Sequence, residues 1–179
     1  MPGLAAAALW LAAGTDPSFI DTGIAGVRLG DERSGSAFVR QHGEPEANSA
    51  DAIPSLRFTT ASKTELLELF IHPGSVRGAF MEFRVSRLRG EPGAAAPTAI
   101  KTFASARGVH LGLALDGVVR ILGAASKRTA RGNSVTLEYR CTSSARCQDL
   151  VRVNMPEYEA RYVFKHGYLD EFQGGYPYP

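Results

Sequence analysis

The two cysteines are the residues whose type and spacing most directly predict chemistry. Cys141 and Cys147 are separated only by the segment TSSAR. An even number of closely spaced cysteines is typical of a disulfide formed in an oxidising compartment. Two free thiols are the alternative. A structural zinc site is disfavoured, because it needs four ligands and no nearby His or Cys pair completes the set. The spacing also excludes a C-x-x-C redox motif.

Other groups that catalyse reactions do not form a recognised motif. The sequence contains no G-x-S-x-G, no H-E-x-x-H and no P-loop. Four histidines lie far apart, and two of them precede Pro-Gly or Gly, where hairpin turns are predicted. They are His42, His72, His110 and His166. We therefore expect a protein that is not an enzyme, with no catalytic residue, no metal site and no cofactor.

Composition narrows the class of protein further. The chain has 179 residues, with 44% hydrophobic and 21% charged residues and a net charge of +2. These values indicate one globular domain or two very small ones. The net charge is small and the basic residues are dispersed, which disfavours a nucleic-acid partner. No apolar run approaches the roughly 20 residues of a spanning helix, so we expect no stable membrane insertion.

The N-terminus carries a short apolar run, residues 4–13 (LAAAALWLAA). This run matches the central region of a secretory signal, and residues 1–14 are a candidate signal segment. No Lys or Arg precedes the run, and a short buried helix is the alternative. Together with the cysteine pair, the run predicts a periplasmic or secreted protein.

Short motifs recur in the same order at an offset of about 81 residues, which indicates an internal duplication. Gly26–Gly30 (GVRLG) recurs as Gly108–Gly112 (GVHLG). Ser55–Phe58 recurs near Thr136–Tyr139, and Ala79–Phe83 near Ala160–Phe164. The predicted organisation is repeat 1 over residues 17–88, a Pro/Gly/Ala-rich linker over 89–98 and repeat 2 over 99–179.

Each copy is predicted to contain one helix followed by three strands. Asp31 and Gly43 mark the start and end of the first helix, and Gly123 ends the second. Period-two alternation predicts strands with inward sets at Leu56/Phe58/Thr60, Leu67/Leu69/Ile71, Met81/Phe83/Val85, Leu137/Tyr139/Cys141, Leu150/Arg152 and Tyr158/Ala160/Tyr162/Phe164. The predicted fold class is α+β, with two tandem repeats, each a helix packed on a three-stranded antiparallel sheet, and the sheets joined side by side.

The combination of a G-V-x-L-G turn, a helix, a closing glycine and a β-meander resembles the outer-membrane assembly lipoproteins of the SmpA/OmlA (BamE) type. Two such units in tandem look like the β-lactamase inhibitory protein family. The resemblance covers most of the chain after residue 20 and rests on Gly26–Gly43 with Leu56–Leu88, and on Gly108–Gly123 with Val135–Phe172. It implies an exported protein-binding module and names no target.

The predicted outward side of the strands is the candidate binding surface. Leu66, Phe70 and Phe80 would form an exposed apolar group rimmed by charged residues, a composition common at protein interfaces. The partner-binding residues predicted on this side are Leu66, Phe70, Phe80, Arg84, Arg140, Arg161 and Lys165. A face covered by another element and ordinary scattered apolar surface are the alternatives. The Tyr/Pro-rich C-terminus is predicted to lie across the fold, and a peptide ligand is its alternative function.

These observations predict an exported bacterial protein that binds another, unidentified protein through its joined sheet face, as an inhibitor or a cell-envelope assembly factor. The alternative is an exported carrier or sensor that binds a small ligand between the helix layer and the sheet.

Overall fold

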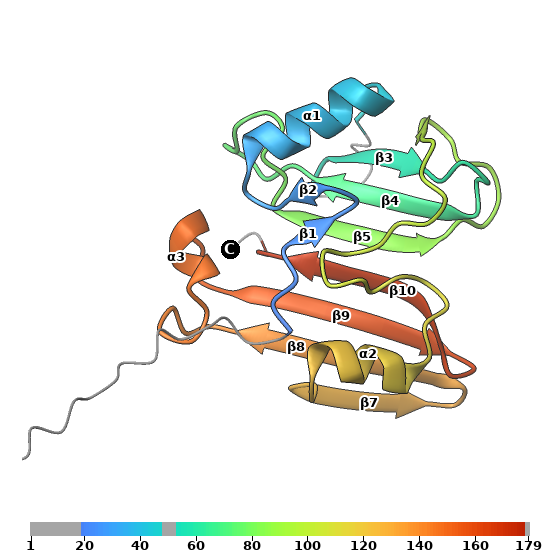
Figure 1. Ribbon diagram of the computed structural model, residues 1–179, viewed down its shortest axis with the longest axis vertical. Helices are drawn as coiled ribbons and strands as arrows, with labels where there is room; N and C mark the ends of the chain where they lie inside the picture. The colour runs from blue at the N-terminus through green and yellow to red at the C-terminus, as the bar shows by residue number, and fades with distance from the viewer. Residues whose placement is uncertain (1–18, 48–52, 178–179) are drawn as a thin grey trace, which may run out of the picture.

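The computed structural model describes residues 19–47 and 53–177 (Figure 1). The candidate signal segment, residues 1–14, lies outside the described residues. The elements in chain order are β1 (Gly23–Ile24), β2 (Val27–Arg28), α1 (Glu32–His42), β3 (Ser55–Thr59), β4 (Glu65–Phe70), β5 (Glu82–Arg87), β6 (Ala96–Pro97), α2 (Leu115–Leu122), β7 (Lys127–Arg131), β8 (Ser134–Cys141), α3 (Asp149–Val153), β9 (Tyr158–Lys165) and β10 (Tyr168–Gly175).

One mixed sheet organises the molecule. Its strand order is β6-β3-β4-β5-β10-β9-β8-β7, and all neighbours are antiparallel except the short β3–β6 pair. A separate two-stranded ribbon is formed by β1 and β2. Strand β10 lies in the middle of the large sheet and pairs with β5 on one side and β9 on the other.

Helices α1 and α2 lie on the same side of the large sheet, together with the β1–β2 ribbon (Figure 1). Aromatic side chains dominate the core between these layers. Phe38 of α1 packs edge-on against Phe58 of β3, with ring centroids 4.9 Å apart. Phe172 of β10 stacks on Tyr162 of β9 and packs edge-on against Phe83 of β5, so the core continues across the join between the strands.

The predictions for the two long helices are confirmed. Asp31 caps α1, because its carboxylate accepts a hydrogen bond from Ser34 N at 2.9 Å. Helices α1 and α2 end at Gly43 and Gly123, both at positive φ, which glycine adopts without steric cost.

The predicted fold class is wrong. The described residues do not form two units that each pack a helix on three strands; they form one continuous eight-stranded sheet, a two-stranded ribbon and three short helices. The physical reason is the position of β10. Its backbone bonds to both β5 and β9, so the strands on either side belong to one hydrogen-bonded layer with one core.

Several strand assignments also change. Leu150 and Arg152, predicted on a strand, lie in α3, which ends at the left-handed residue Asn154. Strand β7 was not predicted, because its sequence KRTAR has no alternating apolar residues. Part of the predicted linker forms β6, whose residues Ala96 and Pro97 pair with β3.

Candidate functional site

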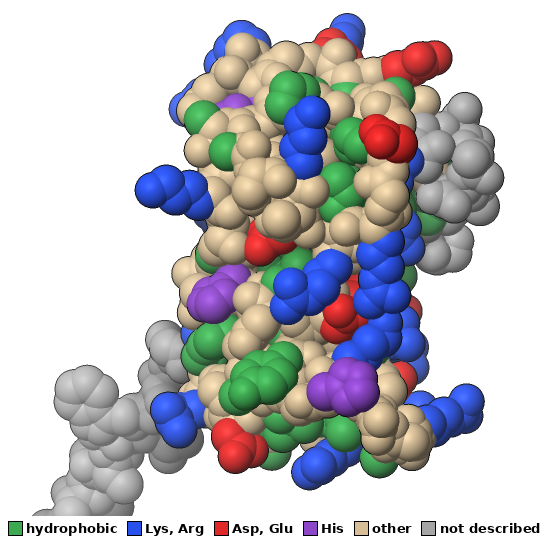
Figure 2. Space-filling view, turned by 90° about the vertical axis from the view of Figure 1, so that its right-hand side faces the viewer, with side chains coloured by type: hydrophobic (Ala, Val, Ile, Leu, Met, Phe, Trp, Pro, Cys, Tyr) green, Lys and Arg blue, Asp and Glu red, His purple; other side chains and the backbone are tan. Residues whose placement is uncertain are grey.

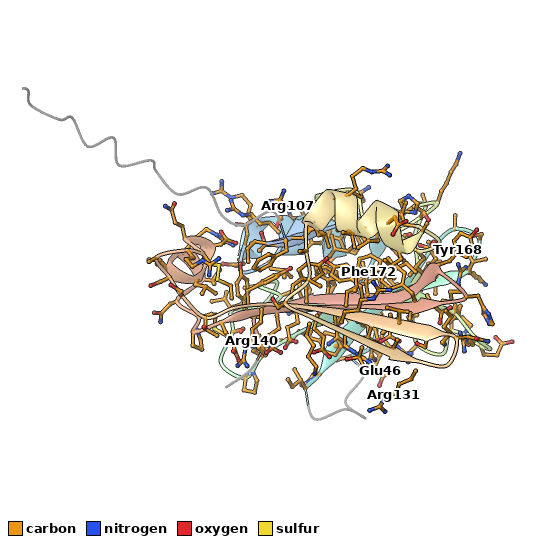
Figure 3. All side chains as sticks on the ribbon, turned by 90° about the horizontal axis from the view of Figure 1, so that it is seen from below. Glu46, Arg107, Arg131, Arg140, Tyr168 and Phe172 are labelled. Carbon is orange, nitrogen blue, oxygen red and sulfur yellow. A yellow bond between two sulfur atoms is a disulfide. The ribbon has the colours of Figure 1, made fainter. Side chains whose placement is uncertain are left out.

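The sheet has a second face, opposite the helices, that no described helix covers. Side chains alternate between the two faces along each strand, and the strand register aligns the outward ones in rows. One row runs through Lys127, Glu138, Arg161, Gln173, Arg84, Glu68 and Arg57, which are Cα partners from strand to strand. Figure 3 shows Arg131 and Arg140 projecting from this side and Arg107 from the other. We call this surface the open face.

Access to the open face differs along the sheet. The outward residues Thr59, Leu66 and Glu68 of β3 and β4 are buried. The outward side chains of β7, β8 and β9 are mostly exposed, and 58% of Arg140 and 44% of Lys165 is accessible. The part of the open face that can meet another molecule therefore extends from β5 across β10 to β7.

The predicted exposed apolar group does not exist, which corrects the set of partner-binding residues. Phe80 is only 1% exposed and lies on the helix side, beside Gly35 of α1. Leu66 does point to the open face but is only 6% exposed. Phe70 is half-buried, and the Arg84 guanidinium lies over its ring at 5.7 Å. Phe80 precedes β5 and so does not follow the alternation that placed it outward.

The other four predicted residues, Arg84, Arg140, Arg161 and Lys165, do share the open face. Three of them are held by carboxylates. Arg84 bonds Glu68 at 2.6 Å. Arg140 bonds Glu157 at 2.8 Å and lies 3.1 Å from Glu159. Lys165 contacts Asp170 at 2.7 Å. Arg161 is the exception: no carboxylate of the described residues forms an ion pair with it.

Arg161 lies in a hollow of the open face that the sequence did not predict. The hollow has a volume of about 410 Å³ and is lined by the outward residues of β7 and β8 with Arg161 and Val163 of β9. A second hollow of similar size adjoins the first and shares Lys127, Glu138 and Arg161 with it; we call the two adjoining hollows the basic trough. No sequence signal pointed to it, since three of its lining residues, Lys127, Thr129 and Arg131, belong to the unpredicted β7.

At one end of the sheet, charged residues gather around Asp170. Its carboxylate contacts Arg87 at 3.3 Å, Arg89 at 2.9 Å and Lys165 at 2.7 Å. Burial opposes ionisation of Asp170, but these three cations outweigh it and lower the pKa of the carboxyl. Figure 2, which views the end where β9 turns into β10, shows Lys and Arg side chains in a column there. The cluster leaves a positive excess beside the open face.

The cysteines form a disulfide, as predicted. Cys141, at the end of β8, is bonded to Cys147, just before α3, with their Cα atoms 6.6 Å apart. The bond closes the loop that positions α3. Asp149, the first residue of α3, bonds Arg152 of the same helix at 2.7 Å and Tyr176 beyond β10 at 2.5 Å. Tyr176 is fully buried, so the start of the C-terminal segment packs against the fold.

Two buried polar groups were missed by the sequence reasoning. Asp21 is 1% exposed, and its Oδ2 has no hydrogen-bond partner among the described residues. The Tyr158 hydroxyl accepts from Asp21 N and donates to Asp21 O, both at 3.1 Å. His72 is 4% exposed and lies 2.7 Å from Glu82. Neither Asp21 nor His72 belongs to a sequence pattern that would have predicted its burial.

Within the described ranges, no three His, Cys, Asp or Glu side chains are grouped as a metal site. The histidine positions are consistent with this finding, because His166 forms the β9–β10 turn and His110 bonds the Leu111 carbonyl. Across the same ranges, none of the helices combines the length and apolarity that a bilayer crossing requires.

Comparison with known proteins gives little further information. No protein-family model matches the chain, and no curated protein matches it. The chain is similar to the crystal structure of a DUF4309 family protein (YjgB) from Bacillus subtilis subsp. subtilis str. 168. The alignment covers 86% of this chain and 84% of that chain, with 12% identity and a TM-score of 0.42. A similarity at this level assigns neither fold nor function.

Proposed function

We propose that the protein is an exported module that binds another protein through its open face. The observation that carries this proposal is the asymmetry of the sheet. One side is covered by α1, α2 and the β1–β2 ribbon, whereas the other presents half-buried side chains on β5 and β10 and exposed ones on β7, β8 and β9. Large accessible sheet faces rich in Arg suit protein recognition, because guanidinium groups combine hydrogen bonding with flat apolar contact.

Export is the second component of the proposal. The disulfide between Cys141 and Cys147 is of the kind that persists in oxidising compartments such as the periplasm. An inhibitor and an envelope assembly factor are both consistent with a binding role of this type.

The test is affinity capture from a bacterial envelope extract with three forms of the protein. In the first variant, Ser86→Trp with Gln173→Trp, bulky rings obstruct the middle of the open face. In the matched control, Ala37→Trp with Asp116→Trp, the same rings lie on exposed positions of α1 and α2. We expect a partner retained by the wild type and the control but lost from the open-face variant. Equal retention by all three forms would contradict the proposal.

A hollow beside α1 favours the small-ligand carrier as a second candidate function. Its volume is about 330 Å³, and apolar side chains of Val39, Leu56, Ile71 and Phe80 line it together with charged residues of its rim. Pockets for small ligands begin at about 300 Å³. A thermal-shift screen of small amphiphilic compounds tests this role. A compound that raises the melting temperature of the wild type should not raise that of Val39→Trp, in which the indole ring fills the hollow.

A further inference from the structure

We infer that the basic trough binds an acidic, extended segment of the partner protein, an inference that rests on the proposed function and names the chemistry of the partner. The trough runs across β7, β8 and β9 on the open face. In the first hollow three cations, Lys127, Arg131 and Arg161, face one carboxylate, Glu138. The second hollow adds Arg140 and Glu159, one charge of each sign.

The positive charge in the trough is not balanced by the carboxylates of the described residues. Glu138 contacts Lys127 at 3.1 Å, so its carboxylate is already compensated. Arg161 is the Cα partner of Glu138 across β8 and β9, yet it forms no ion pair with Glu138. Arg131 likewise has no ion pair with any carboxylate in the described part of the chain. Two guanidinium groups therefore remain available for carboxylates of another molecule.

The lining between these two arginines is compact and, apart from Val163, polar. Thr129 and Thr136 are Cα partners in the row between them, and Ser134 is the partner of Arg131. Hydroxyl groups both donate and accept hydrogen bonds, so they suit the backbone and carboxylates of a peptide. Small side chains on this row also leave room for an incoming segment.

The spacing matches an extended peptide. Outward residues of a strand recur about every 7 Å, because each residue advances about 3.4 Å and alternate residues share a face. Lys127, Thr129 and Arg131 follow this spacing along β7. Carboxylates on alternate residues of an extended peptide are also about 7 Å apart. Each carboxylate can therefore lie beside one cross-strand row of trough residues, and the next carboxylate beside the next row.

Glu138 and Glu159 line the two hollows and disfavour a nucleic acid as the occupant. Their carboxylates interrupt the basic lining, so a continuous phosphate backbone would not find an unbroken line of cations, whereas a peptide can place neutral residues beside them. The first hollow also contains no aromatic ring on which a base could stack.

The experiment measures binding of a fluorescent peptide of alternating Glu and Ser residues to the full chain by anisotropy, with the Gln/Ser peptide as the ligand control. The test variant is Arg131→Gln with Arg161→Gln. The protein control is Arg33→Gln with Arg120→Gln, which removes the same charge from exposed positions on α1 and α2. We expect the wild type and the helix control to bind the Glu/Ser peptide equally, and the trough variant to bind at least about tenfold more weakly.

Three results would overturn the inference: equal weakening by both variants, equal binding of the Gln/Ser peptide, and tighter trough-dependent binding of oligothymidylate. The outcomes also separate this inference from the proposed function. If the trough variant leaves peptide binding unchanged while Ser86→Trp with Gln173→Trp abolishes partner capture, the open face binds a protein but the trough does not recognise acidic segments. If neither response is seen, both proposals fail.

Discussion

The Tyr176 hydroxyl donates a 2.5 Å hydrogen bond to Asp149 Oδ2 and so ties the segment after β10 to the first turn of α3. The Arg152 guanidinium bonds the same carboxylate and also donates to Leu29 O at 3.0 Å, between β2 and α1. One carboxylate therefore joins three parts of the chain that are distant in sequence. The disulfide secures the loop that leads to this carboxylate.

This contact predicts a specific acid sensitivity. Burial opposes ionisation of Asp149, but hydrogen bonds from Arg152 and Tyr176 outweigh it and lower its pKa from 3.8 to about 2. Because the folded-state pKa is depressed, the stabilisation is present above the unfolded pKa and is lost as pH falls toward 2. Tyr176→Phe should lower the free energy of unfolding by about 2 kcal/mol at pH 7. Denaturant titrations between pH 2 and 7 measure both effects, with the exposed Tyr168→Phe as control.

A second pH effect of opposite sign is predicted at Asp21. Burial raises the pKa of this carboxyl, although hydrogen bonds from Ser105 and the Arg107 backbone partly oppose the rise. A raised folded-state pKa means that stability is greatest below the unfolded pKa and falls as pH rises through the folded pKa. Asp21→Asn should therefore stabilise the protein at pH 7 and have no such benefit near pH 3. Thermal melts compare it with Asp31→Asn, which keeps a helix cap; equal melting shifts for both variants at pH 7 would contradict the prediction.

Gly35 of α1 is predicted to be intolerant of any side chain. A Cβ atom there would lie 1.9 Å from the Gly78 carbonyl oxygen, which belongs to backbone and cannot swing away. Gly35→Ala should destabilise the protein by roughly 1 to 3 kcal/mol or more, as overpacking does. Gly117 of α2 is the matched control, because a Cβ there meets its nearest atom at 4.0 Å. Gly117→Ala should be neutral or stabilising by up to about 1 kcal/mol in chemical denaturation.

Phe80 is predicted to behave as a core residue, contrary to its expected outward position. Phe80 and Phe83 are each 1% exposed. Phe80→Ala and Phe83→Ala should both cost on the order of 3 to 5 kcal/mol of stability. Urea unfolding of the two variants side by side tests this. A Phe80→Ala protein that unfolds at the wild-type midpoint would show that the ring is not in the core.

The disulfide is expected to make a modest contribution to the free energy of unfolding. The loop between Cys141 and Cys147 is short, so removing the bond should cost roughly 2 to 3 kcal/mol. Cys141→Ser with Cys147→Ser, melted with and without reductant, is the measurement. Reductant should lower the melting temperature of the wild type only. A similar reductant effect on the variant would mean that the effect does not arise from this bond.

Local signals predicted local structure well. Asp31, Gly43 and Gly123 marked helix ends because capping depends on only a few neighbouring residues. The alternating sets in β5, β8 and β9 were assigned correctly, since period two reflects one buried face. In β3 and β4 the predicted inward residues are buried, but most of their outward neighbours are buried as well. These features need no knowledge of distant partners.

Features that depend on tertiary contacts were not predicted. Strand β7 is a charged sheet edge, held by hydrogen bonds to β8 rather than by apolar side chains. Strand β10 pairs with β5, which lies far away in sequence, and no local pattern encodes that partner. The basic trough could not be identified for the same reason, because its cations come together only when β7 joins the sheet.

The central position of β10 in the sheet also limits the order in which the strands can fold. Strands β5 and β9 both need β10 as a neighbour, yet β10 is the last of the described strands to be synthesised. Until it arrives, β5 has one unpaired edge, and the aromatic rings of Phe83 and Tyr162 lack their shared contact, Phe172. A chain emerging from a ribosome or crossing a secretion channel would thus stay incompletely folded until residue 175 had passed. The native core of the described residues therefore closes only after the last of their strands is available.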